Sequence, residues 1–179
     1  YCGVIALVLG LMFFTCSKIK IRERIAGGVL LLFFIFSFII RQLDFIWHGF
    51  HFPNMLPHRF SFLFSFVLIA MAYRMFMNLQ HSKLYHVFFT LALLLAVIGV
   101  AIKYQEKEAI IGTAFIAVLV LVWITLYILK IVPKQALAVA LFIICVAEGA
   151  CTTYIGVKTV GTTTTTSYPL GTTATQEVV

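Results

Sequence analysis

Charged residues are scarce in this chain, and their scarcity is the first constraint on its class. Only 11% of the 179 residues are Asp, Glu, Lys or Arg, whereas 63% are hydrophobic, and the mean hydropathy is +1.09. A soluble domain needs a polar shell, and the chain holds too little charge to build one. The composition therefore excludes an ordinary soluble protein and predicts a protein embedded in a membrane.

Cysteine is also sparse, and its positions exclude two kinds of site. Cys2, Cys16, Cys145 and Cys151 lie in or beside apolar runs, without a CxxC pair or a histidine at ligand spacing. We therefore expect neither a disulfide framework nor a zinc site, and we interpret these side chains as small packing or lipid-facing groups. An initiator methionine is missing as well, and the chain starts inside an apolar run, so we interpret it as an internal fragment of a longer protein.

Long apolar runs are abundant, and they indicate the fold class. The hydrocarbon core of a bilayer, about 30 Å thick, needs roughly 20 apolar residues of helix, because lipid leaves backbone groups to be bonded within the segment. We predict an all-α, polytopic transmembrane helix bundle over residues 1–158, followed by a Thr-rich linker over residues 159–179. About six spans are predicted, at residues 1–17, 25–43, 60–78, 84–102, 109–129 and 136–155.

Basic residues gather on alternate connections, which predicts how the chain is oriented. One side carries the whole formal net charge of +7, and the other is neutral. The positive-inside rule makes the basic side cytoplasmic, so the loop over 47–59 and the C-terminal segment are predicted to be extracytoplasmic. Because the charge lies in short loops beside the spans, we expect membrane lipids as partners and no nucleic acid. The basic side holds Lys18, Lys20, Arg22, Arg24, Arg74, Lys83, Lys130 and Lys134.

The stretch WHGFHFPNMLPHRFSFLFSF, residues 47–66, is the most polar interruption of the apolar runs. Its prolines forbid a continuous helix, and irregular backbone at membrane depth must be buried in protein or line a cavity. Arginine matches phosphate oxygens with a planar fork of donors, and lipid phosphates lie at the depth of helix ends. We predict a lipid-phosphate-binding site here; the alternative is that the arginines extend to ordinary headgroups. The candidate residues are Arg59, Arg41, His48, His51, Asn54 and, from a later span, Glu148.

Other polar groups in the spans leave alternatives open. The histidines are candidates for proton transfer, or for metal binding with Asp44, or are simply hydrogen-bonded polar tips. Trp47 is either part of an interfacial aromatic belt or a platform for a sugar ring or prenyl chain. Glu148 is a carboxylate inside a span, which is a functional hypothesis by default; it either reaches water or pairs with an arginine of the loop. No metal site is predicted, although a divalent metal is left open.

The loop resembles that of a known family. The pattern W-H-G-F-x-x-P-N-M-L-P-x-R-F-S-F, followed by a Phe-rich span, is similar to the bacterial YfhO family of large polytopic membrane proteins. The segment VAEGACTTYIGVKTV, with a carboxylate near the outer end of a span, also resembles that family. The similarity is clear over residues 47–66 and extends in general layout over about 25–158.

The resemblance implies a GT-C type glycosyltransferase with an active site on the outer face of the cell membrane. Such an enzyme takes a sugar from a polyprenyl-phosphate carrier, without a certain cofactor, and adds it to a cell-envelope polymer such as a teichoic acid. The acceptor hydroxyl attacks the anomeric carbon, a carboxylate acts as base, and cationic groups stabilise the departing phosphate. Family enzymes are expected to place the base in an earlier outer loop, so we expect this fragment alone to be inactive.

Two other functions account for the same residues. A lipid or solute transporter or flippase also uses broken segments at the membrane face, although it would need paired interrupted helices and one interruption is visible. A non-catalytic membrane scaffold would use the loop to bind another protein. The identities of the sugar and the acceptor do not follow from these residues.

Overall fold

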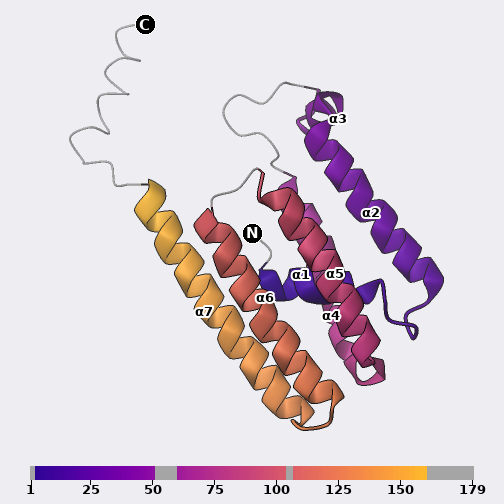
Figure 1. Cartoon of the computed structure of the whole chain (residues 1–179). Helices are drawn as coiled ribbons and strands as arrows, with labels where there is room; N and C mark the ends of the chain where they lie inside the picture. The colour runs from indigo at the N-terminus through magenta and orange to yellow at the C-terminus, as the bar shows by residue number, and fades with distance from the viewer. Residues whose placement is uncertain (1–2, 51–59, 104–106, 161–179) are drawn as a thin grey trace, which may run out of the picture. The chain divides into compact units, whose positions relative to one another are not determined.

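The structure, a computed structural model, describes residues 3–50, 60–103 and 107–160, apart from the side chains at 107–109 and 159–160. Every regular element in these ranges is a helix (Figure 1), which confirms the predicted all-α class. The helices are α1 (Val4–Phe13), α2 (Ile21–Ile39), α3 (Arg41–Trp47), α4 (Ser61–Met77), the 3₁₀ helix η1 (Leu79–His81), α5 (Leu84–Ala101), α6 (Lys107–Ile128) and α7 (Lys134–Val160).

Helix length and hydropathy support a membrane protein with fewer full spans than the six predicted. Among the described residues, three helices are long and apolar enough to cross a bilayer, and the bent pair α2 and α3 adds a fourth if it is one span. Helix α1 has 10 residues and is therefore only about 15 Å long, while α4 has 17 residues. These two runs looked like spans in the sequence because their apolar stretches include residues outside the helices.

The chain forms two compact units, Tyr1–Cys145 and Val146–Val179, and the division falls inside α7. The sequence analysis placed a boundary near residue 158, where the composition changes. Helix α7 also continues to Val160, past the predicted end of the last span at residue 155.

Helix α1 forms the centre of the first unit. It packs against α4, α5 and α6, and in Figure 1 it runs across them rather than alongside. Val8 and Met12 are completely buried and Leu9 is 4% exposed, so this apolar helix contributes the inside of the core. A Cβ added at Gly10 would lie 2.6 Å from Leu68 Cδ1 on α4, which shows how closely the two helices approach each other.

The outward surfaces of the longer helices are apolar. Phe36, Phe88, Phe115 and Phe142 are all largely exposed, although each lies within a helix. In water such a surface would drive association, whereas in a bilayer it is the face that contacts lipid. The exposed apolar surface therefore agrees with the membrane location that the composition predicts.

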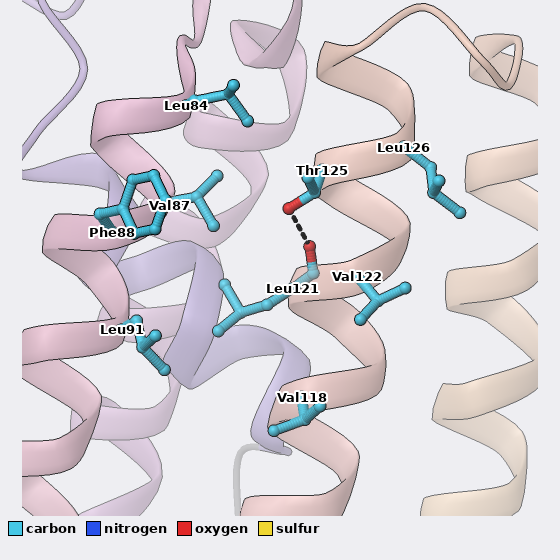
Figure 2. Close-up of a pocket in the computed structure, with 9 residues that line it drawn as sticks. All are labelled: Leu84, Val87, Phe88, Leu91, Val118, Leu121, Val122, Thr125 and Leu126. Carbon is cyan, nitrogen blue, oxygen red and sulfur yellow. Dashed lines mark hydrogen bonds between the residues drawn. The ribbon is translucent and has the colours of Figure 1, made fainter.

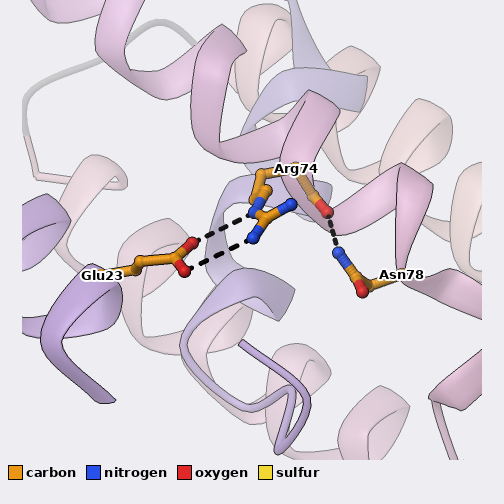
Figure 3. A network of polar contacts seen from close by, with 3 residues as sticks. All are labelled: Glu23, Arg74 and Asn78. Atoms are coloured by element: carbon orange, nitrogen blue, oxygen red, sulfur yellow. Dashed lines mark hydrogen bonds and ion pairs between the residues drawn. The ribbon is translucent and has the colours of Figure 1, made fainter. Parts of the chain in front are cut away.

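Polar contacts join the helix ends at one end of the unit. Arg74, near the end of α4, forms a two-point ion pair with Glu23 in the first turn of α2, at 3.0 Å from Nε to Oε2 and 3.3 Å from Nη2 to Oε1 (Figure 3). Arg24 donates to the Phe14 carbonyl, and the Lys134 ammonium lies 5.7 Å from the centre of the Phe76 ring. The basic connections of the predicted inner side thus lie together.

Candidate functional site

The candidate site is built on a sharp break between α2 and α3. Ile40 leaves the helical conformation, with φ −92° and ψ 109°, and the axes of the two helices differ by 102°. The predicted span over 25–43 is thereby divided. Arg41 and Asp44 therefore belong not to α2 but to a separate short helix that leads into the loop over residues 47–59.

The end of α3 carries a buried pair, Asp44 and His48. Their side chains are 11% and 9% exposed, and His48 Nδ1 lies 3.4 Å from Asp44 Oδ1. Nδ1 also lies 2.8 Å from the Asp44 carbonyl oxygen. A carbonyl oxygen only accepts hydrogen bonds, so this contact requires the hydrogen on Nδ1.

The tautomer determines what the other ring nitrogen can do. His48 Nε2 is buried and has no hydrogen-bond partner within the described residues. In the neutral ring it carries a lone pair, and in the protonated ring it is a donor whose charge is balanced by Asp44. A buried nitrogen with this capacity requires a polar partner or costs stability. The neutral ring suits a ligand that donates a hydrogen bond to Nε2, and the protonated ring suits an anion that accepts one from it.

The backbone beyond α3 turns abruptly. Gly49 and Phe50 both have positive φ, 68° and 62°, and the Phe50 amide donates to the Phe45 carbonyl at 3.0 Å. The left-handed conformation costs Gly49 little but is strained for Phe50, and strain of this kind concentrates at functional sites. The turn ends α3 and sends the chain into residues 51–59.

Aromatic rings hold the three helices around this turn. Successive stacked contacts link Phe34 to Trp47 at 6.0 Å, Trp47 to Phe60 at 5.0 Å, and Phe60 to Phe38 at 5.0 Å between ring centres. Phe34 and Phe38 lie on α2, Trp47 lies on α3, and Phe60 precedes α4. This aromatic stack therefore joins both ends of the loop over residues 47–59, called the polar loop below.

The stack gives Trp47 a structural role. The indole is near-parallel to two rings, at 29° to Phe34 and 17° to Phe60, and is also 6.2 Å from Phe33. The indole therefore packs against neighbouring rings and links α2 to the start of α4, while the residue is still 38% exposed. Both predicted roles, in an aromatic belt and as a platform, stay predictions.

The pattern of the whole chain identifies its family. A family model described as the bacterial membrane protein YfhO matches residues 1–179. The chain belongs to the YfhO family. Comparisons with curated proteins and with solved structures find no match.

The structure describes only some of the predicted site residues of this YfhO chain. Arg41 is exposed at the start of α3, one turn before Asp44, and His48 directly follows the end of the same short helix. Arg59, His51 and Asn54 fall outside the described residues. For these three, phosphate binding stays a prediction.

Glu148 belongs to the second unit of the YfhO chain. Its residue is 5% exposed and lies on α7. Buried carboxylates inside a span are costly and suggest a function, but the two units are not placed relative to each other, so pairing of Glu148 with the loop stays a prediction. The described residues contain no group of three or more His, Cys, Asp or Glu side chains close enough to hold a metal ion.

Two polar pairs of the YfhO chain escaped the sequence analysis. The Asp44 and His48 pair could have been found from its spacing of four residues, which places side chains on one helical face. The Glu23 and Arg74 pair could not, because its partners are 51 residues apart.

Proposed function

We propose that this protein is part of an integral membrane glycosyltransferase that moves a sugar from a polyprenyl-phosphate carrier to a cell-envelope polymer on the outer face of the cytoplasmic membrane. The observation that supports it most is the buried Asp44 and His48 pair beside the aromatic stack, at the turn into the polar loop. The family and the membrane helices are consistent with this role.

The chemistry of the pair suits the phosphate of the donor. When His48 is protonated, Nε2 becomes a charged donor, and Asp44 balances its charge and keeps the ring oriented through Nδ1. Arg41, and Arg59 from its place in the sequence, supply further positive charge. As the glycosidic bond breaks, negative charge grows on the leaving phosphate, and fixed donors stabilise that charge.

The neighbouring surface suits the rest of the donor. A polyprenyl chain is hydrocarbon, and α2 and α4 present large exposed apolar side chains such as Phe36 and Phe66. The donor phosphate would then lie at the helix ends while its chain stays in the bilayer. We propose that the base that activates the acceptor hydroxyl comes from outside residues 1–179, as the family resemblance implies.

The test uses the native cells with the complete protein. We expect that deleting the protein removes one glycosyl substituent from purified envelope polymers, measured by mass spectrometry. We also expect that His48→Gln lowers kcat/KM for the polyprenyl-linked sugar by roughly 10- to 100-fold, because it removes one charged hydrogen bond to the donor. His81→Gln is the matched control, because His81 is exposed on η1 at the other end of α4.

Each result of this test has a definite meaning. Unchanged kcat/KM in His48→Gln, with membrane insertion intact, would remove His48 from the site. Unchanged polymers after deletion would contradict the glycosyltransferase itself. Arg59→Ala in the same cells tests the sequence prediction for the loop, and accumulation of lipid-linked donor is the expected result.

A transporter or flippase is the second candidate, and the bend of 102° between α2 and α3 is the observation that favours it. Broken helices often form the substrate sites of transporters. This function predicts that His48→Gln impairs movement of the lipid-linked sugar across the membrane of reconstituted vesicles. Transfer of the sugar to the polymer, measured with a separate glycosyltransferase and donor added outside the vesicles, should be normal.

A further inference from the structure

A groove between α5 and α6 lies away from the candidate site. Its volume is about 350 Å³, and its walls include Leu84, Phe88 and Leu91 from α5 and Val118, Val122 and Leu126 from α6 (Figure 2). The first half of α5 follows the end of α4, whereas Trp47 at the end of α3 stacks on Phe60, directly before α4. The groove and the Asp44 and His48 pair therefore belong to opposite ends of the unit.

The walls of the groove suit a hydrocarbon chain. Among the lining residues, Thr125 has the polar side chain and the others are Leu, Val or Phe. The Thr125 hydroxyl donates its hydrogen bond to the Leu121 carbonyl at 2.7 Å, within the same helix, so it has no hydrogen left to donate to a ligand. A polar ligand would lose its hydration without gaining hydrogen bonds, whereas an acyl chain would fill the space with dispersion contacts.

Two lysines mark one end of the groove. Leu84 and Leu126 lie at the same end in Figure 2; Lys83 directly precedes Leu84, and Lys130 follows Leu126 by about one helical turn. Both lysines are exposed. Lys130 has φ 60° and ends the helical segment, where its amide donates to the Tyr127 carbonyl. An apolar groove with positive charge at one end is complementary to a lipid with an anionic headgroup.

We propose that this groove binds an anionic membrane phospholipid, with one acyl chain between α5 and α6 and the headgroup phosphate beside Lys83 and Lys130. The basic end of the unit is the predicted cytoplasmic side, and the cytoplasmic leaflet is rich in anionic lipids, which attract basic residues beside the membrane. A polyprenyl-linked donor would instead bind at the other end, near His48. The bound phospholipid would fill the space that α5 and α6 leave between them.

The experiment uses the purified full chain in detergent and a phosphatidylglycerol probe with a photoreactive group in its acyl chain. Cross-linked peptides are identified by mass spectrometry. We expect labelling on the groove faces of α5 and α6. The double variant Lys83→Gln/Lys130→Gln should lower labelling by roughly tenfold, given the usual attraction of each lysine to an anionic lipid surface.

Matched variants separate the groove from a general effect. Lys18→Gln/Lys20→Gln removes the same charge from two exposed lysines elsewhere and should leave labelling unchanged. Val122→Trp should block the groove, whereas Val139→Trp, on an exposed face of α7, should not. The charge variants alter only exposed side chains, so they test the proposal even if Val122→Trp fails to fold.

Three results would overturn the proposal. The first is labelling spread over all lipid-facing helices and insensitive to the charge variants, which is ordinary contact with surrounding lipid. The second is equal competition by phosphatidylcholine, which would exclude a role for the anionic headgroup. The third is displacement by polyprenyl phosphate at lower concentration than by phosphatidylglycerol, which would make the occupant a lipid-linked substrate.

Discussion

At the scale of single residues, the polar loop is supported by a small number of closely fitted side chains. His48 is oriented by the carbonyl and the carboxylate of Asp44, and Trp47 is held by neighbouring rings. Phe60 occupies the middle of the stack, between Trp47 and Phe38. One ring at the start of α4 therefore determines how α2, α3 and α4 meet.

Removing that ring should destabilise the protein. Phe60 is 4% exposed, and we expect Phe60→Ala to lower the free energy of unfolding by about 3 kcal/mol, the typical cost of deleting a buried phenylalanine ring. Phe62→Ala is the control, because Phe62 is 66% exposed and lies two residues away. Thermal denaturation in detergent measures both. Equal effects of the two substitutions would mean that the aromatic stack does not contribute specifically to stability.

At the scale of helices, close packing depends on small residues at two crossings. A Cβ at Gly10 would lie 2.6 Å from Leu68 Cδ1 and 3.8 Å from the Leu68 carbonyl oxygen, and one at Gly27 would lie 3.2 Å from Met71 Sδ. Both contacts bring a helix against α4. Small residues allow such approach in membrane bundles, where dispersion replaces the hydrophobic effect between helices.

A larger residue at the first crossing should separate α1 from α4. We expect Gly10→Val to lower the free energy of unfolding by about 2 kcal/mol, as overpacking of a core does. Gly99→Val introduces the same side chain on α5, where an added Cβ meets nothing within 4 Å, and should have little effect. The melting temperatures of the two purified variants provide the comparison. If Gly10→Val melts as the parent does, α1 and α4 are not in close contact in the membrane.

At the scale of the whole molecule, the charge pattern and the contacts agree about which helix ends lie together. The Glu23 and Arg74 pair, the Arg24 contact with Phe14 and the position of Lys134 beside Phe76 all lie at the basic ends of their helices. The α3 turn follows the other end of α2. The positive-inside rule would then place the turn outside the cell.

Chemical labelling of cells tests this orientation. In a protein whose native cysteines are replaced by serine, we expect Phe50→Cys to react with a membrane-impermeant maleimide added to intact cells. Lys130→Cys should react only after the cells are made permeable. Both positions are exposed, so access across the membrane is the variable that differs. The reverse labelling pattern would show that the basic side faces outward and would move the candidate site to the cytoplasm.

The sequence alone was sufficient to predict the spans and the family, because both depend on residues that are close together in the chain. A helix in lipid must form all of its backbone hydrogen bonds within itself. An apolar run of adequate length is therefore enough to predict a span, whichever helices lie beside it. The predicted runs over 84–102 and 109–129 accordingly match α5 and α6 within two residues at each end. The family was also accessible, because its loop pattern is continuous in the chain.

Tertiary structure decided what depends on contacts between distant residues. The sequence around the break at Ile40 contains no proline or glycine that would predict it. The break accompanies the stacking of Trp47 on Phe60, two residues that the loop separates in sequence. The partner of Arg74 and the groove between α5 and α6 likewise require side chains from different helices to meet. Composition and periodicity determined that this chain enters a membrane as helices. Packing between those helices decided where a buried histidine, an ion pair and an open groove are found, because these contacts join residues that no local pattern connects.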